Sequence, residues 1–377
     1  MNIPIIKLHF SESDILTLAQ DLKELLNSGQ IAMGAKTQKF EELFAAFCGT
    51  KAALGVVNGT AALEIISRAL DLFGSSVCVP AHTFMATALA PIAAGAKIIL
   101  VETDPFFGQM DPLDLEKKIQ KDTKAVFMVH LGGYIAPEFK KIVDICSSAG
   151  ILLIEDAAHA HGAEVDGARA GSWGKAGAFS FYPTKVLTTG EGGMVTTSDQ
   201  DLVEKLKVLR QHGQTKPGSN LHEEFGLNYR PSEIHALLGL NALARADEIL
   251  FSRRKAARVY DSLLQNSPIT PVVPPVNQKP SYYKYLAHLP PHIPREDFKT
   301  RLLEKWGVKL AGEVYTTPLQ LQPFWKNYPE FLAAPLVNLH QACRFAKTHI
   351  CLPIWPGIPA SDQERVVEAL LKTLQGF

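Results

Sequence analysis

The sequence predicts an α/β protein with a mostly parallel sheet flanked by helices and a smaller C-terminal α+β domain. Three observations support this class. Between residues 52 and 156, short apolar runs alternate with helix-like segments, which is the pattern of βαβ units. After residue 197 the pattern changes to helices, and a proline-rich stretch follows at 268–280. The chain has 377 residues, of which 46% are hydrophobic, and this is enough for a large core. We predict one domain at 1–250 and a second at 251–377.

The alternation follows two N-terminal helices, predicted at 11–29 and 37–47, with Ser11 or Ser13 capping the first. The predicted strands of the sheet are 52–57, 77–79, 97–101, 125–130 and 151–156. The helices between them are predicted at 61–72, 83–93, 112–120 and 138–148. Ligands bind at the carboxyl ends of such strands, so polar residues that follow a strand are candidates for a site.

The second half of the chain is predicted to be mostly helical at first. Helices are expected at 199–212, 231–250 and 253–266, with Pro231 in the first turn of the second, a favoured place for proline. A polar loop, 213–227, separates the first two. The tail is predicted to hold a strand at 283–289 and helices at 295–306 and 360–374.

Charge and cysteine usage exclude several classes of protein. Lysine plus arginine (38) equals aspartate plus glutamate (38), so the formal net charge of zero does not favour nucleic acid or an anionic membrane as a partner. No stretch approaches the 18 apolar residues of a membrane span, and the N-terminus lacks a signal-peptide core. The five cysteines have no CxxC spacing, which favours reduced, buried thiols in a cytoplasmic protein over a disulfide framework or zinc site.

The most informative stretch runs from residue 152 to 197. One apolar run ends in Asp156, and a second leads to Lys185 and the glycine turn 190–193. The 29 residues between them (185 − 156) leave room for a strand and a connection that bring the lysine back near the aspartate. Pyridoxal phosphate needs an amine to hold it as a Schiff base and an acid to keep its ring nitrogen protonated. Each residue taken singly is more often a loop carboxylate or a surface lysine.

Three further features suit a phosphorylated, planar cofactor, although each has an ordinary structural alternative. Asn58-Gly59-Thr60 joins a strand to a helix, where backbone amides and the helix start attract an anion. Ser180 offers a hydroxyl on the strand that leads to Lys185, and Phe84 offers a ring at a strand end. The alternatives are a plain helix start, a buried serine bonded to backbone and a core phenylalanine.

His159 and His161 leave a rival hypothesis open, a metal hydrolase that uses both with Asp156. His-Ala-His brings alternate side chains together only on an extended chain. A metal site would also leave Lys185 and the phosphate seat unused. We therefore predict no metal.

These residues together resemble the DegT/DnrJ/EryC1/StrS family of sugar aminotransferases, a branch of the fold-type-I pyridoxal-phosphate enzymes. The resemblance covers nearly the whole chain. It is carried by NGTAALEI, VPAHTFMATALA, IEDAAHAHGA, FSFYPTKVLTTGEGGMV, LNYRPSEIHALLG and PLQLQP, with an entry segment at 34–50. The FSF…TK…GEGG and EDAA blocks are highly specific when both occur in this order.

The resemblance implies roles for single residues. Lys185 is the Schiff-base lysine, Asp156 the partner of the pyridinium nitrogen, His159 lies near the phenolic oxygen, and Phe84 stacks on the ring. The implied phosphate contacts are Gly59, Thr60 and Ser180. Asn228 is implied to reach the phosphate of the neighbouring subunit, which makes a homodimer with shared sites obligatory.

The resemblance is less specific about the substrate. Arg230, Tyr315 and Gln320 are candidate substrate contacts, with Arg230 a candidate for the carboxylate of the donor. The chain departs from the family pattern at Asn58, where serine is usual, at Ala35, where proline is usual, and at Gln320, where histidine is frequent. Family members with histidine in place of the lysine are dehydratases, so Lys185 favours transamination.

The function implied is transfer of an amino group from glutamate or glutamine to a keto- or aldehydo-sugar, most often nucleotide-linked, in amino-sugar biosynthesis. Lys185 moves the proton while pyridoxal phosphate, and then pyridoxamine phosphate, carries the nitrogen. Two alternatives stay open. One is transamination of a free sugar or a cyclitol ketone, since the run from Tyr282 to Tyr285 mildly resembles family members that act on cyclitols. The other is a non-catalytic regulator on the same fold.

Overall fold

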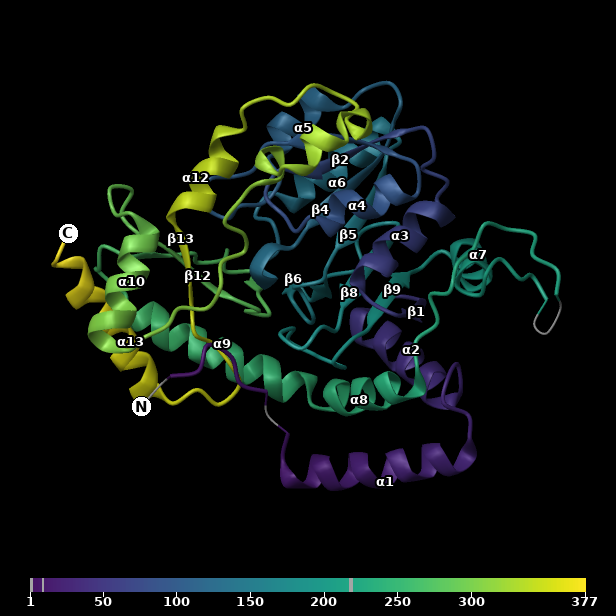
Figure 1. Ribbon diagram of the computed structural model, residues 1–377, viewed down its shortest axis with the longest axis horizontal. Coiled ribbons are helices and arrows are strands. Elements are labelled where there is room, and N and C mark those ends of the chain that lie inside the picture. The colour runs from purple at the N-terminus through teal and green to yellow at the C-terminus, as the bar shows by residue number, and fades with distance from the viewer. Residues whose placement is uncertain (1–2, 9, 217–219) are drawn as a thin grey trace.

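The computed structural model describes residues 3–8, 10–216 and 220–377. A seven-stranded sheet lies at its centre (Figure 1). The strand order is β1-β9-β8-β5-β4-β2-β3. The strands are β1 (Ala52–Val56), β2 (Ser76–Pro80), β3 (Lys97–Val101), β4 (Thr123–Val129), β5 (Leu152–Asp156), β8 (Ala176–Ser180) and β9 (Gly193–Thr197). β9 alone runs in the direction opposite to the other six strands, which confirms the prediction of a mostly parallel sheet.

Helices cover both faces of this sheet, as the alternating pattern predicts. One face packs against α3 (Gly59–Ala69), α4 (Ala86–Ala93) and α7 (Gln200–Arg210). The other packs against α2 (Ala35–Cys48), α5 (Pro112–Lys118) and α6 (Phe139–Ala149). Successive strand residues point to opposite faces, so Val77 and Val79 lie in one core and Cys78 in the other.

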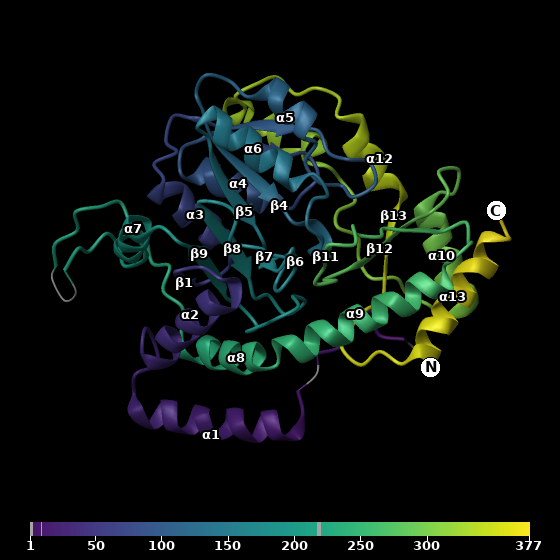
Figure 2. The same cartoon turned by 180° about the vertical axis from the view of Figure 1, so that it is seen from behind.

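Two consecutive helices, α8 (Glu233–Ala244) and α9 (Ala246–Leu263), run along one edge of the molecule, and α1 (Glu12–Ser28) lies beside α8 (Figures 1 and 2). An ion pair of 2.7 Å between Arg245 and Asp14 ties α1 to the junction of these helices. The side chain of Ser11 caps α1, as one of the two predicted capping residues.

The prediction of one helix over 231–250 is wrong at both ends. The chain leaves helical geometry at Arg245, where α8 ends, and α9 then continues through residue 250. Ser232 is the N-cap and accepts a hydrogen bond from the amide of His235, so Pro231 lies outside the helix rather than in its first turn. The domain boundary at residue 250 stays a prediction.

The C-terminal part packs around a third core, separate from the two that cover the central sheet. Its antiparallel sheet has the order β10 (Thr270–Pro271), β12 (Tyr285–His288) and β13 (His349–Leu352). Helices α10 (Arg295–Trp306) and α13 (Ala360–Leu374) lie against each other at this end and have the predicted bounds. The proline-rich stretch 268–280 supplies β10 and also β11 (Gln278–Lys279).

Short elements complete the fold. They are β6 (Glu164–Val165), β7 (Ala168–Arg169), β11 (Gln278–Lys279), α11 (Phe324–Asn327), α12 (His340–Thr348) and the 3-10 turns η1 (Leu131–Gly133), η2 (Leu319–Leu321) and η3 (Pro329–Phe331). Residues 217–219 of the predicted loop 213–227 lie outside the described residues. Among the described residues, no helix is both long and apolar enough to cross a membrane.

Candidate active site

A cavity of about 420 Å³ opens at the carboxyl ends of the central strands. The segments that follow β1, β2, β5 and β8 supply most of its wall, and Tyr283 and Tyr315 from the C-terminal part complete it. The structure thus brings together eight of the predicted site residues: Gly59, Thr60, Phe84, Asp156, His159, Ser180, Lys185 and Tyr315.

Asp156 is the last residue of β5, and two donors fix its buried carboxylate. The hydroxyl of Thr87 donates to Oδ2 at 2.8 Å, and the amide of Ala158 donates to Oδ1 at 3.2 Å. Burial raises the pKa of Asp156, while these hydrogen bonds and the charge of Lys185 act in the opposite direction. Thr87, on α4, is a functional residue that the sequence did not reveal, because no local pattern places α4 next to β5.

The adjacent carboxylate, Glu155, points to the other face of the sheet and has a structural role. Its oxygens accept hydrogen bonds from the amides of Gly171, Trp173 and Gly174, all at 2.7–2.8 Å. The imidazole of His130 lies 3.0 Å away. The alternation of a strand therefore separates two neighbouring acids into one that faces the cavity and one that holds a loop.

Lys185 follows β8 in a turn closed by a hydrogen bond from its amide to the carbonyl of Tyr182, at 2.9 Å. Its Nζ lies 4.8 Å from the centre of the Tyr283 ring. Burial lowers the pKa of Lys185 to about 8, with Asp156 opposing and Lys284 adding to the shift. A larger fraction of this amine than of an ordinary lysine is therefore unprotonated near neutral pH, and the unprotonated form is the one that attacks a carbonyl.

The start of α3 forms a seat of the right kind for a phosphate. The side chain of Asn58 caps the helix by accepting a hydrogen bond from the amide of Ala61 at 2.8 Å, and the amides of Gly59 and Thr60 lie in the first turn, where the helix provides no partner. A Cβ on Gly59 would come within 2.7 Å of the Ser180 Cβ. Only glycine lets this helix start approach Ser180 so closely.

His159 presents a hydrogen-bond donor to the cavity. Its Nδ1 accepts a hydrogen bond from the amide of Gly132 at 3.3 Å, so the neutral ring carries its hydrogen on Nε2, 3.3 Å from the hydroxyl of Tyr315. Burial holds the pKa of His159 well below its ordinary value. Burial also raises the pKa of Tyr315 far above its usual range, so its hydroxyl stays protonated.

Tyr283 is the second functional residue that sequence reasoning missed, since its aromatic run reads as an ordinary strand. Its ring stacks on His159 with centroids 4.3 Å apart, and its hydroxyl lies 2.9 Å from that of Thr184. Phe84, whose ring is 57% exposed, lies 5.5 Å from the ring of Tyr315. The cavity therefore has aromatic walls on two sides.

The structure does not assemble the rival metal site. His161 is fully buried among the rings of Phe44, Phe179 and Phe181, at centroid distances of 5.0–6.4 Å, and does not line the cavity with His159. Within the described ranges, histidine, cysteine and acidic side chains form no cluster suited to a metal ion.

Three predicted residues lie outside this cavity. Asn228 is exposed, and its side-chain oxygen accepts a hydrogen bond from the amide of Arg230 at 3.2 Å. Gln320 is buried, and its side-chain amide donates to the carbonyl of Leu339 at 3.1 Å. Its amide nitrogen is therefore bonded within the chain and does not face the cavity. Substrate contact by Arg230 or Gln320 stays a prediction without geometric support within one chain.

Comparison with known proteins agrees with this geometry. Residues 14–371 match the model of the DegT/DnrJ/EryC1/StrS aminotransferase family. The chain is 35% identical over 355 residues, 94% of each protein, to dTDP-3-amino-3,6-dideoxy-alpha-D-galactopyranose transaminase of Aneurinibacillus thermoaerophilus. It is also 32% identical, over 100% of both chains, to a pleiotropic regulatory protein of Geobacillus stearothermophilus.

Among solved structures, S. venezuelae DesV in complex with a ketimine intermediate superposes with a TM-score of 0.90, at 32% identity over 98% of each chain. Sequence, fold and cavity therefore agree, and the chain belongs to the DegT/DnrJ/EryC1/StrS aminotransferase family.

Proposed function

We propose that this aminotransferase uses pyridoxal phosphate to move an amino group from glutamate or glutamine to a nucleotide-linked keto-sugar. One observation carries the proposal. A half-buried amine with a lowered pKa, Lys185, and a buried carboxylate, Asp156, line one cavity beside the anion seat at Gly59. The name of the relative from A. thermoaerophilus, a transaminase of a dTDP-linked sugar, supports the class of acceptor.

The residues of the cavity fit this cofactor. Bound pyridoxal phosphate supplies an electron sink that allows the α-carbon of an amino acid to lose its proton. Lys185 holds the cofactor through its amine and, once displaced, moves that proton as general base and then general acid. Asp156, fixed by Thr87, keeps the proton on the ring nitrogen. The phosphate group is assigned to the Gly59 and Thr60 amides and the Ser180 hydroxyl, the ring face to Phe84, and the phenolic oxygen to the Nε2 hydrogen of His159.

A homodimer with shared sites is part of the proposal. Asn228 lies on an exposed segment outside the cavity of its own chain, which suits a residue that serves a second copy. Mixing Lys185→Ala protein with Asn228→Ala protein tests this directly. In a mixed dimer, one of the two sites then has both native residues, so the mixture regains activity that neither parent shows. No recovery after subunit exchange contradicts sharing.

The absorption spectrum of the purified protein tests the central proposal. Visible absorption from bound cofactor that falls on addition of L-glutamate or L-glutamine, and returns with a keto-sugar, establishes both halves of the transfer. Lys185→Ala retains cofactor without responding in this way. Comparing nucleotide-linked keto-sugars with free sugars and cyclitol ketones then distinguishes the two classes of acceptor.

A non-catalytic regulator is the second candidate, favoured by the name of the relative from G. stearothermophilus. Lys185 and Asp156 are both present here, which argues for catalysis. A protein that binds no pyridoxal phosphate, or binds it and responds to no amino donor, would support the regulator instead.

A further inference from the structure

Tyr315 enters the cavity from an irregular segment, and two buried histidines hold its peptide bond to Val314. His82 Nε2 lies 2.7 Å from the carbonyl oxygen of Val314 and 2.8 Å from the amide nitrogen of Tyr315. His349 Nε2 accepts a hydrogen bond from the amide of Val314 at 3.1 Å. Imidazole nitrogens therefore contact the amide and the carbonyl of Val314 and the amide of Tyr315.

The two histidines come from different parts of the molecule. His82 lies just after β2 of the central sheet, and His349 is the first residue of β13. Nδ1 of His349 donates to the carbonyl of Phe345 at 2.7 Å, which leaves Nε2 as the acceptor that the Val314 amide needs. With its hydrogen on Nε2, neutral His82 donates to the carbonyl of Val314. With its hydrogen on Nδ1, it accepts at Nε2 from the amide of Tyr315. Burial lowers the pKa of His82 to about 4 and that of His349 well below its ordinary value, so both rings are neutral near pH 7.

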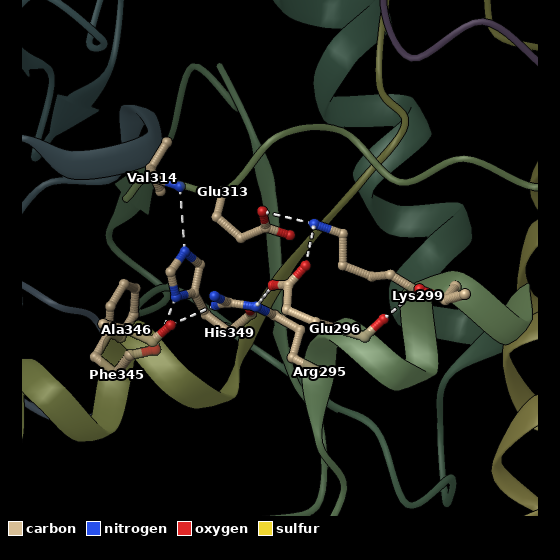
Figure 3. A network of polar contacts seen from close by, with 9 residues as sticks. Arg295, Glu296, Lys299, Glu313, Val314, Phe345, Ala346 and His349 are labelled. Atoms are coloured by element: carbon tan, nitrogen blue, oxygen red, sulfur yellow. Dashed lines mark hydrogen bonds and ion pairs between the residues drawn. The ribbon is translucent and has the colours of Figure 1, made fainter. Parts of the chain in front are cut away.

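A polar network from α10 supports this arrangement (Figure 3). The guanidinium of Arg295 donates to the carbonyls of Ala346 and His349, the latter at 3.1 Å. Lys299, one turn further along α10, forms an ion pair of 2.9 Å with Glu313, the residue before Val314. Helix α10 therefore contacts both the histidine and the segment that it holds.

We propose that His82 and His349 are positioning residues that hold the Val314–Tyr315 backbone and thereby set the Tyr315 hydroxyl against His159. Neither histidine lines the cavity, and each is at most 1% exposed. Burying an imidazole has a cost unless its nitrogens are paired, and Nε2 of each ring is paired with the segment that carries Tyr315. The expected effect of these histidines on kcat rests on the proposed function, whereas their expected effect on the Val314–Tyr315 backbone does not.

Hydrogen exchange of the cofactor-free protein tests the structural part. In His349→Leu, the amides of Val314 and Tyr315 are expected to exchange at least about tenfold faster, because a lost hydrogen bond opens this segment locally. His349→Gln, which offers an acceptor in place of Nε2, is expected to keep the native rate. His288→Leu is the matched control, because His288 is also a buried histidine of the C-terminal part but bonds Thr348 and Phe106. Native exchange in His349→Leu, or equal acceleration in His288→Leu, overturns the proposal.

A double-mutant cycle tests the kinetic part. Tyr315→Phe and His349→Leu are each expected to lower kcat for the donor half-reaction about tenfold. The double variant is expected to lose no more than the larger single loss, because both changes remove the same contact with His159. Losses that multiply overturn the proposal. His82→Gln and His82→Leu repeat the comparison should His349→Leu fail to fold. If the wild-type protein binds no cofactor, the proposed function is wrong. The amide exchange rates of Val314 and Tyr315 still test whether the histidines hold this segment.

Discussion

The cavity has two halves that are built in different ways. On the sheet side, Asp156 ends β5, and Gly59 and Lys185 lie three and five residues after the ends of β1 and β8 (59 − 56 and 185 − 180), so strand pairing brings them to one edge. On the other side, Tyr283 and Tyr315 are placed by contacts with residues 99 and 233 positions away, Thr184 and His82. Short motifs therefore mark the half that strand ends position, and they say little about the half that tertiary contacts position.

The largest effect is expected on the sheet side. Lys185→Ala removes the amine that holds the cofactor and moves the proton, so transamination should fall by about 10⁴-fold or more. Single-turnover reaction with L-glutamate measures the loss, with circular dichroism as the control for folding. Activity within tenfold of wild type would show that Lys185 is not the reacting amine.

The neighbouring acids of β5 provide the sharpest contrast on that side. Asp156→Asn is expected to lower kcat about 10³-fold with little change in unfolding temperature, because it keeps the shape but not the charge beside the ring nitrogen. Glu155→Gln should instead cost about 3 kcal/mol of unfolding free energy, since its buried carboxylate accepts three backbone amides. Denaturant titration and kinetics on both variants separate the roles, and the reverse pattern would refute the assignment.

The pKa of Lys185 depends on both halves, because Asp156 raises it and Lys284, from the C-terminal side, lowers it. Capture of pyridoxal phosphate by the cofactor-free protein needs the unprotonated amine. Its rate should therefore rise about tenfold per pH unit up to a midpoint near 8 and level off above it. Lys284→Gln should move the midpoint upward. An unchanged midpoint in Lys284→Gln would mean that the two halves of the cavity are electrostatically independent.

The tyrosine side is expected to give smaller effects. Tyr283→Leu removes the ring beside Lys185 and His159 and should lower kcat about tenfold, whereas Tyr283→Phe keeps the ring, loses only the bond to Thr184 and should lower it about threefold or less. Steady-state kinetics with the amino donor measure both. Equal losses would assign the effect to the hydroxyl instead of the ring.

These differences explain what the sequence predicts and what it does not. The alternation of strands and helices predicts the sheet, and Asp156 and Lys185 follow from it because a strand end is a local property. Thr87 escaped prediction because its contact with Asp156 depends on how α4 packs over β5. Helix α8 begins where Ser232 caps it and ends where Arg245 leaves helical geometry. Hydrophobic periodicity does not encode either of these features. Asn228 is exposed and Arg230 is half-buried, and both lie outside the cavity of their own chain, so the roles proposed for them depend on a second copy of the chain.

His161 shows how little sequence proximity to a site implies, and it gives the smallest expected effect. Two residues from His159, it lies in an aromatic cluster, and burial lowers its pKa to about 3. Because the unfolded chain binds a proton there near pH 6.5, the neutral buried ring contributes stability that is present above pH 6.5 and lost as the pH falls toward 3. His161→Phe removes this titration. Its unfolding free energy should therefore fall less than that of wild type between pH 7 and pH 5, by about 2 kcal/mol at 1.4 kcal/mol per pH unit. Identical pH dependence in the two proteins would show that the ring is already charged or solvated. Transamination at pH 7 should remain within about threefold of wild type, since the His161 side chain does not line the cavity.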